Sequence, residues 1–282
     1  MDWKKTKSIF ILTFLVLNLF LGYQLYQKND INKIARLSEQ PLEEILANNK
    51  VTYEDKLPKY KPEQTLISAQ RYKFTPEEKT AYKSKEIKLD KDSSTDITLS
   101  YTLTKPMDLP KKDSKDLIAS LTKFLEENVN RGKEYTFYKW DKEKNIVWFN
   151  QTYLNKQIFF DTKNFEETKE NKSDYEAPNG MVKFILDDKG NLKEYTQTYL
   201  VIYTQGESQE IISPKKALGR LLDTAHLTTG DHVQDIRLGF FSLVLVGDSQ
   251  VYAPTWLIET EDGQYLVNAT DSSIQVLSGE QD

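Results

Sequence analysis

The sequence of 282 residues is acidic, with a net charge of −5, and it contains no cysteine. An acidic chain is a poor nucleic-acid binder, and a chain without cysteine forms neither disulfides nor a Cys-based zinc site. Aromatic residues make up 12% of the chain, which is enough for a real core and argues against disorder. We therefore expect a folded protein that binds no nucleic acid.

The N-terminal segment has the features of an uncleaved membrane anchor. Residues 8–27 carry no formal charge, and as a helix at about 1.5 Å per residue they would span roughly the hydrocarbon core of a bilayer. Three lysines precede this run, which keeps the N-terminus inside, and no small-residue cleavage site follows it. We expect residues 1–7 to be a cytoplasmic tail and 8–27 a single transmembrane helix, with an extracellular body. The alternative is a cleaved signal peptide.

One side of this anchor is predicted to contact partner helices. Asn18 lies near the middle of the span, where an unpaired amide is costly. Gly22 follows one turn later and would let a neighbouring helix approach closely. The predicted partner-binding face consists of Phe14, Leu15, Asn18, Gly22 and Leu25, with Leu19 expected on another face. The alternative is that Asn18 bonds locally or meets a thinned bilayer.

The next segments indicate a stalk followed by a first module. Residues 28–50 are predicted to form a helical stalk, with Pro41 in the first turn of a second short helix; a flexible tether is the alternative for its first half. Alternating residues then predict strands, and one amphipathic helix is expected at about 113–132. Its apolar face comprises Leu117, Ile118, Leu121, Phe124, Leu125 and Val129. We assign residues 51–170 to a first extracellular α+β module.

The remaining chain repeats this order. Residues 166–180 are highly charged and indicate a surface loop or domain boundary. A hairpin turning at Asp188–Asn191 follows, then a helix capped by Ser213, then antiparallel strands. The inward face of this helix is predicted to comprise Ala217, Leu218, Leu221, Leu222 and Ala225. We assign residues 177–282 to a second extracellular α+β module. Each module is predicted to be a curved antiparallel sheet with one helix; the likeness indicates either duplication or coincidence of a common pattern.

No residue pattern indicates catalysis, a cofactor or a metal. Of the two histidines, His226 ends a helix, where a cation is favoured. Ser213-x-x-Lys216 has the spacing of a penicillin-binding nucleophile, but the accompanying S-x-N-type and K-T-G elements are missing, and a helix cap explains Ser213. A wall-modifying enzyme is kept as an alternative and would need a deep cleft with two facing carboxylates. We expect a protein that is not an enzyme.

The N-terminal stretch carries the most specific pattern. Its informative pieces are Met1-Asp2-Trp3, Thr6-Lys7, Ile9-Phe10, Phe14-Leu15 and Leu17-Asn18-Leu19-Phe20-Leu21. In these pieces the chain resembles the YycI (WalI) family of Gram-positive bacteria. The resemblance is specific over about 27 residues and general over the remainder.

The resemblance implies a regulator without catalysis. Members of the family act on the sensor histidine kinase WalK (YycG) of the WalRK two-component system, which governs cell-wall metabolism. The implied partners are this kinase, through the transmembrane helices, and a YycH-like single-pass protein in a heterodimer. The second module also resembles PepSY-type domains, so the alternative function is inhibitor or chaperone of an exported enzyme.

Overall fold

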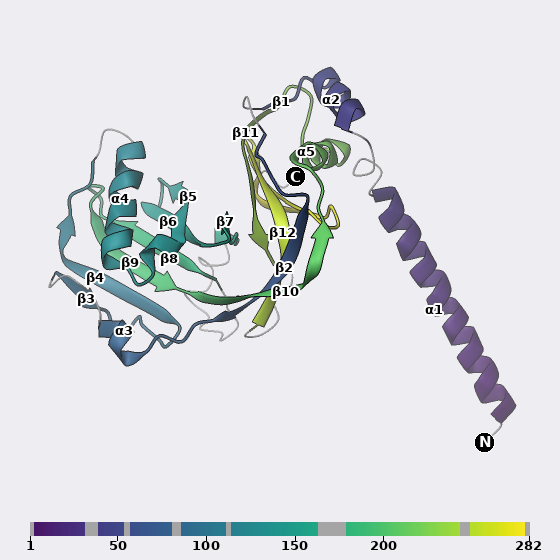
Figure 1. Cartoon of the computed structure of the whole chain (residues 1–282), viewed down its shortest axis with the longest axis horizontal. Helices are drawn as coiled ribbons and strands as arrows, with labels where there is room; N and C mark the ends of the chain where they lie inside the picture. Colours follow the sequence, from purple (N-terminus) through teal and green to yellow (C-terminus); the bar gives the residue numbers. More distant parts are fainter. Residues whose placement is uncertain are drawn as a thin grey trace. The chain divides into compact units, whose positions relative to one another are not determined.

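The structure is a computed structural model, and it describes residues 3–31, 39–53, 57–80, 86–110, 114–162, 179–242 and 249–279. The chain divides into two compact units (Figure 1). The first consists of Met1–Pro62, Ile212–Ile236 and Ile258–Asp282, and the second of Glu63–Ile211 and Arg237–Leu257. The chain thus enters each unit more than once.

The N-terminal helix α1 runs over Trp3–Ile31 and contains the expected anchor. It extends beyond the predicted span at both ends, to Trp3 and to Ile31. The side chains of residues 8, 9 and 24–27 lie outside the described ones. Among the described residues, no helix combines the length and the apolar character that crossing a membrane requires.

The first unit contains two helices and a set of strands that neighbour one another in the order β1-β11-β12-β13-β14. Its helices are α2 (Glu39–Asn48) and α5 (Pro214–Asp223). Its complete strands are β1 (Thr52–Tyr53), β13 (Gly263–Asn268) and β14 (Ile274–Gly279). It also contains β11 (His232–Phe241) as far as Ile236 and β12 (Ser249–Thr260) from Ile258 onward. Helix α2 packs against α5 and buries Leu42 and Leu46. The second half of the expected stalk is therefore part of a folded unit, since its apolar stripe is covered.

The second unit contains a six-stranded antiparallel path with α4 (Ser114–Asn128) on one face (Figure 1). The strands follow the order β3 (Ile87–Leu89), β4 (Thr98–Met107), β9 (Leu192–Thr198), β8 (Met181–Leu186), β6 (Ile146–Tyr153) and β5 (Tyr135–Asp141), with β7 (Lys156–Gln157) beside β6. The short helices are α3 (Pro76–Thr80) and η2 (Gly132–Glu134). The predicted apolar face of α4 is confirmed: Leu117, Leu121, Phe124, Leu125 and Val129 are buried in one cluster with the sheet, and Ile118 packs at its margin.

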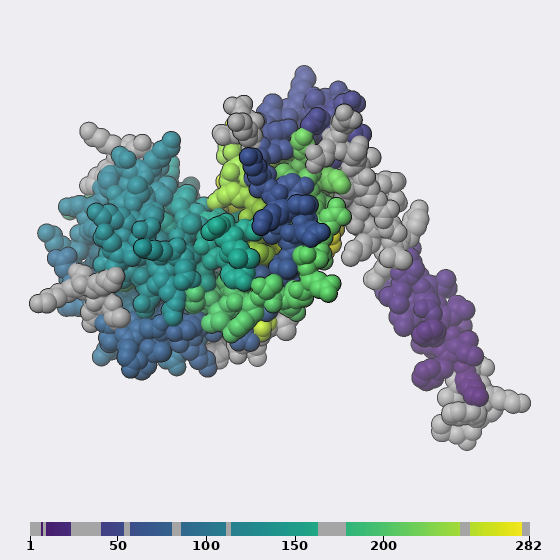
Figure 2. Space-filling model, viewed as in Figure 1, coloured from purple at the N-terminus to yellow at the C-terminus, as the bar shows by residue number. Residues whose placement is uncertain are grey.

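The same unit also contains β2 (Glu63–Arg71), which lies between β10 (Leu200–Glu210) and part of β12. Ile67, Ala69, Leu200, Phe240 and Tyr252 bury their side chains together in the core of this group. Figure 2 shows β10, in green, at the surface.

The hairpin β8–β9 differs from the sequence expectation. It turns as predicted, since β8 ends at Leu186 and β9 begins at Leu192. However, β8 pairs with β6 and β9 pairs with β4, so this hairpin completes the first sheet and does not open a second module. The boundary expected between residues 170 and 177 therefore falls within one sheet, in a segment (163–178) that lies outside the described residues.

A shared order does relate the two halves. Helix α4 leads into β5, β6, β8 and β9, which neighbour one another in the sheet, and α5 leads into β11, β12, β13 and β14 in the same manner. The shared pattern is a helix followed by four strands that neighbour one another, with the two-residue strand β7 as an addition in the first case. It runs from 114 to 198 in the first case and from 214 to 279 in the second.

Candidate functional site

Some of the residues of the predicted partner-binding face lie together on one side of α1. Phe10, Ile11, Phe14, Leu15, Asn18 and Leu19 line one continuous side. Three of the five predicted face residues are in this set. Gly22 is exposed one turn beyond Asn18, and a Cβ there would meet nothing within 4 Å. The side chain of Leu25 lies outside the described residues.

Leu19 corrects one detail of that prediction. It lines the same side as Asn18, because a step of one residue turns the helix by only about 100°. Phe20 is two steps from Asn18 and lies on the far side of the helix by the same rule. Phe20 is the better control position.

Ser213 caps α5. Its side chain accepts a hydrogen bond from the Lys216 backbone N–H at 3.3 Å, and Pro214 occupies the first turn. The capping interpretation of the Ser-x-x-Lys spacing is thus confirmed. The hydroxyl is buried against its own helix, where it satisfies one of the free N–H groups.

The two histidines have local partners. His226 Nδ1 lies 2.9 Å from Thr224 Oγ1, and His232 Nδ1 lies 2.9 Å from Thr52 Oγ1. Among the described residues, no group of three or more His, Asp or Glu side chains could hold a metal ion. Both rings serve local contacts in the first unit.

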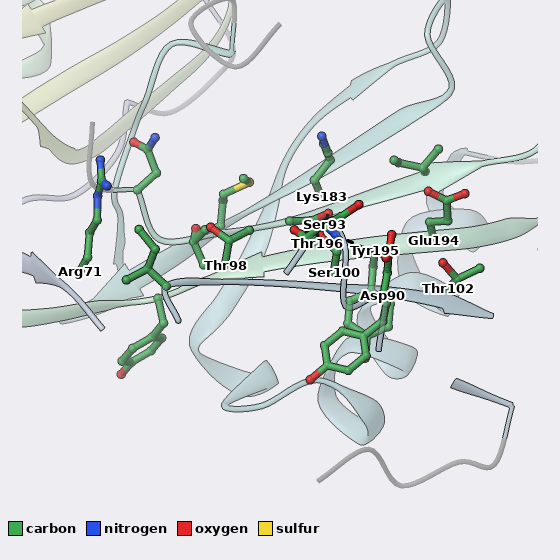
Figure 3. A pocket seen from close by; sticks show the side chains of 17 residues that line it. Arg71, Asp90, Ser93, Thr98, Ser100, Thr102, Lys183, Glu194, Tyr195 and Thr196 are labelled. Carbon is green, nitrogen blue, oxygen red and sulfur yellow. Dashed lines mark hydrogen bonds between the residues drawn. The ribbon is translucent and has the colours of Figure 1, made fainter. Parts of the chain in front are cut away.

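A polar hollow lies on the face of the six-stranded sheet opposite α4 (Figure 3). Its volume is about 420 Å³. The alternation of the strands produces it: Leu99, Tyr101 and Leu103 point into the core, so Thr98, Ser100 and Thr102 point the other way. Its polar lining includes Arg71, Asp90, Thr98, Ser100, Lys183, Glu194 and Thr196.

The two carboxylates in the hollow, Asp90 and Glu194, have structural partners. Hydrogen bonds from Ser93 and Asp92 hold the pKa of Asp90 below its ordinary value, so this carboxylate is an ionised turn residue. Glu194 pairs with Lys193 at 2.7 Å. Neither histidine lines the hollow. It offers hydroxyls and charges of both signs to a polar ligand, without a nucleophile paired to a base.

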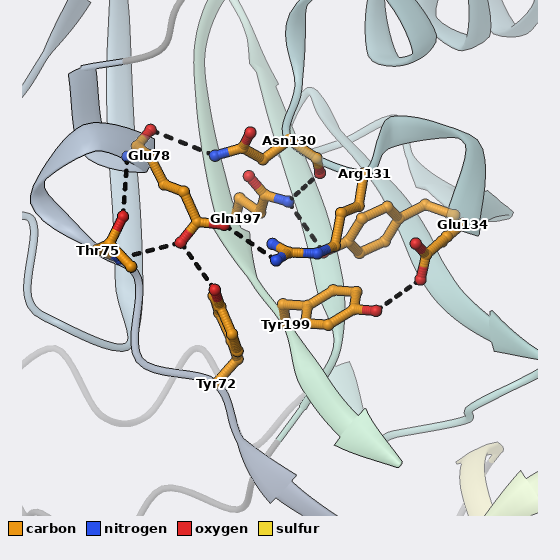
Figure 4. A network of polar contacts seen from close by, with 9 residues as sticks. Tyr72, Thr75, Glu78, Asn130, Arg131, Glu134, Gln197 and Tyr199 are labelled. Atoms are coloured by element: carbon orange, nitrogen blue, oxygen red, sulfur yellow. Dashed lines mark hydrogen bonds and ion pairs between the residues drawn. The ribbon is translucent and has the colours of Figure 1, made fainter.

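A charged and aromatic network lies at the end of β9 (Figure 4). The Arg131 guanidinium is 4.5 Å from the centre of the Tyr72 ring and 4.8 Å from that of Tyr199, and it pairs with Glu78 at 2.9 Å. The Tyr72 hydroxyl donates to Glu78 at 2.9 Å, and the Tyr199 hydroxyl donates to Glu134 at 2.6 Å. The network joins α3 to the segment after α4 and to the end of β9.

Electrostatics in this network favour an ionised Glu78 and a neutral Tyr199. Partial burial opposes the charge of Glu78, but hydrogen bonds from Thr75 and Tyr72 and the neighbouring Arg131 outweigh it and lower its pKa. Burial and the Glu134 carboxylate raise the pKa of Tyr199 to about 12. No sequence pattern predicts this network, because it joins three segments that are distant in the chain.

The sequence profile of the YycI protein family matches residues 29–270. This chain belongs to the YycI family. The family is a regulatory one and is associated with the WalK (YycG) two-component system. The matched range begins after residues 8–27, the expected anchor, so the remaining chain carries a family pattern that no short motif revealed. Among curated proteins, no match is found.

Two solved structures are similar to this chain over most of its length. One is an uncharacterized protein from Eubacterium rectale, with 7% identity and a TM-score of 0.47, covering 80% of this chain and 90% of the other. The second is the Bacillus megaterium YpeB C-terminal domain, with 14% identity and a TM-score of 0.39, covering 86% of this chain and 99% of the other. At these scores neither likeness bears on function.

Proposed function

We propose that this YycI family member is a non-enzymatic, membrane-anchored regulator of the WalK sensor kinase. Together with a YycH-like single-pass partner it would control cell-wall homeostasis. The observation that carries the proposal is the family match over residues 29–270. The capped Ser213 and the locally engaged carboxylates of the hollow agree with a protein that acts by binding.

The proposal places residues 8–27 in the cell membrane, with the N-terminus in the cytoplasm and the body outside. It rests on the uncharged run and the preceding lysines. A kinase whose own helices cross the same bilayer is then within reach of α1.

We further propose that Asn18 and Gly22 mark the helix side that contacts the kinase. A small residue lets another helix approach, and an amide then bonds across the interface. Such bonds contribute about 0.6 kcal/mol on average and about 1–2 kcal/mol at best. That range is enough to change the population of a complex several-fold without preventing insertion.

The test is co-purification of the kinase from cells that express Asn18→Leu together with Gly22→Leu. Recovery of the kinase is expected to fall several-fold, and transcription of its wall genes to shift. Phe20→Leu, on the far side of α1, is the matched control and should change neither. Intact mass must show that residues 1–27 are retained. Unchanged recovery with the double variant would reject this face, and loss of residues 1–27 would reject the anchor.

A further inference from the structure

Strand β10 has one open edge. It pairs with β2 in regular register from Leu200↔Arg71 to Gln205↔Leu66 and, after a shift in register, again at Gln209 and Glu210. Within the described part of the chain it pairs with no other strand. Residues 203–210 are exposed throughout. The regular part of this open edge, residues 200–205, is a template for another strand.

The direction of the peptide groups along β10 follows from one hydrogen bond. Tyr72 N donates to Tyr199 O at 2.9 Å, so residue 199 faces β2. Antiparallel pairing alternates residue by residue. The main-chain groups of Val201, Tyr203 and Gln205 therefore also face β2, and those at positions 200, 202 and 204 face the open edge.

Gln151 occupies the first position of that edge. Its side-chain amide accepts a hydrogen bond from Leu200 N at 2.8 Å and donates one to Leu200 O at 3.0 Å. These are the two bonds that a neighbouring strand would make. Gly180 permits this placement, because a Cβ there would lie 2.0 Å from Gln151 Oε1. The next outward groups, those of Ile202 and Thr204, receive no such contact within the described residues.

The side chains beside this edge are suited to a particular partner. Tyr203 and Val251 are 53% and 47% exposed, and both lie opposite Ser68 on one face of the sheet. Farther along, Glu210 lies directly opposite Glu63, and Glu207 is exposed nearby. Like charges opposite one another destabilise a strand pair, and added cations would relieve the repulsion.

We propose that β10 accepts an extended, basic segment of a partner protein as an added strand. The partner's main chain would bond to Ile202 and Thr204, its apolar side chains would cover Tyr203, and its Lys or Arg would meet Glu207 and Glu210. A second copy of this chain is a poor occupant, because pairing two β10 strands adds acid to acid. The open edge of β10 would then be a partner-binding surface of the proposed regulator. Its role in regulation rests on that function, whereas strand binding does not.

The test uses the full chain in a non-ionic detergent and a labelled seven-residue peptide of alternating lysine and valine. Thr204→Pro removes one outward N–H while keeping the bonds to β2, and proline is tolerated on edges in this way. Its affinity for the peptide should fall about threefold to tenfold. Thr204→Val, which keeps the N–H, should bind as the native chain does. Amide exchange at residues 202 and 204 should slow when the peptide is bound.

Two further measurements test the main-chain bonds and the charges separately. A peptide of the same charge with alternate backbone N-methyl groups should not bind, and Glu207→Lys with Glu210→Lys should weaken binding of the unmethylated peptide. Equal binding by Thr204→Pro, or by the methylated peptide, would overturn strand addition, as would self-association through this edge. Kinase recovery measured in parallel separates the outcomes: an Asn18 effect without a Thr204 effect leaves the regulator standing and removes this surface.

Discussion

At the scale of single residues, Arg131 shows how this fold uses a cation. It has a left-handed backbone with φ of 52°, which turns the chain after α4 and directs the guanidinium between two tyrosine rings. A planar cation can stack on aromatic faces and still pair with a carboxylate. Lysine would provide the charge without the stacking. Arg131 therefore adds an ion pair and two ring contacts to segments that backbone hydrogen bonds already hold together, such as the one from Tyr72 N to Tyr199 O.

The stabilising effect of this contact should depend on pH. Glu78 has a lowered pKa, so its contribution is complete above the ordinary carboxyl range and is lost as the pH falls through the lower value. Glu78→Gln should reduce the free energy of unfolding at pH 7 by about 1 kcal/mol. The difference should shrink below about pH 4.

Urea unfolding of both proteins across this pH range measures the effect. Glu127→Gln, on the exposed side of α4, is the matched control and should be close to neutral at every pH. A Glu78 effect that stayed constant from pH 7 to pH 3 would show that the charge is not responsible.

At the scale of elements, α5 is specified by its own sequence. Ser213 and Pro214 set its start, and Ala217, Leu218 and Leu221 are buried as predicted. Leu222, still in the helix, is only half-buried. The helix ends at Asp223, and Ala225 beyond it is exposed with φ of 57°. Periodicity found the buried face but extended it by one turn.

The cap provides a prediction that also separates structure from catalysis. Ser213→Ala should lower the stability of the protein by about 1 kcal/mol, because it leaves a helix N–H unsatisfied. Ser213→Asp should recover most of the loss, since aspartate caps as well as serine. Thermal unfolding of the two variants decides the matter; a loss that aspartate did not recover would contradict the capping role.

The elements that could be predicted are those with local causes. The amphipathic face of α4 and the turn after Leu186 follow from spacing and turn chemistry within a few residues. The pairing of β2 with both β10 and β12 joins residues well over a hundred positions apart, and alternation alone does not say which strand lies beside which. For the same reason, Gln151 and Arg131 gave no signal.

At the scale of the whole molecule, the order of the chain misleads about its units. The charged segment before Asn179 has the composition of a boundary, yet β6 and β8 pair across it. A longer connection between two strands costs little free energy, so the charged composition of this segment does not prevent the pairing. By contrast, the second unit includes Arg237–Leu257 from near the C-terminus. No change in composition along the chain predicts that this segment returns to the second unit.

This interleaving predicts how a truncated chain behaves. A fragment of residues 57–211 keeps every strand of the six-stranded path but loses β11 and β12. It therefore lacks Phe240 and Tyr252, which are buried with Ile67, Ala69 and Leu200. Two buried aromatics contribute about 1.5–3 kcal/mol each, and an isolated two-stranded pair is only marginally stable. In this fragment, β2 and β10 should therefore lose their protection.

Hydrogen exchange provides the measurement. In the fragment, amides of 146–153 and 192–198 should remain protected, because their sheet and α4 are complete, while those of 63–71 and 200–205 should exchange far faster than in the full chain. The full chain is the control and should protect both groups. Protection of β2 in the fragment equal to that in the full chain would mean that β12 contributes nothing to the pair. Loss of protection at 146–153 would instead mean that the six-stranded sheet depends on the returning segment, and that the second unit folds only once nearly the whole chain is present.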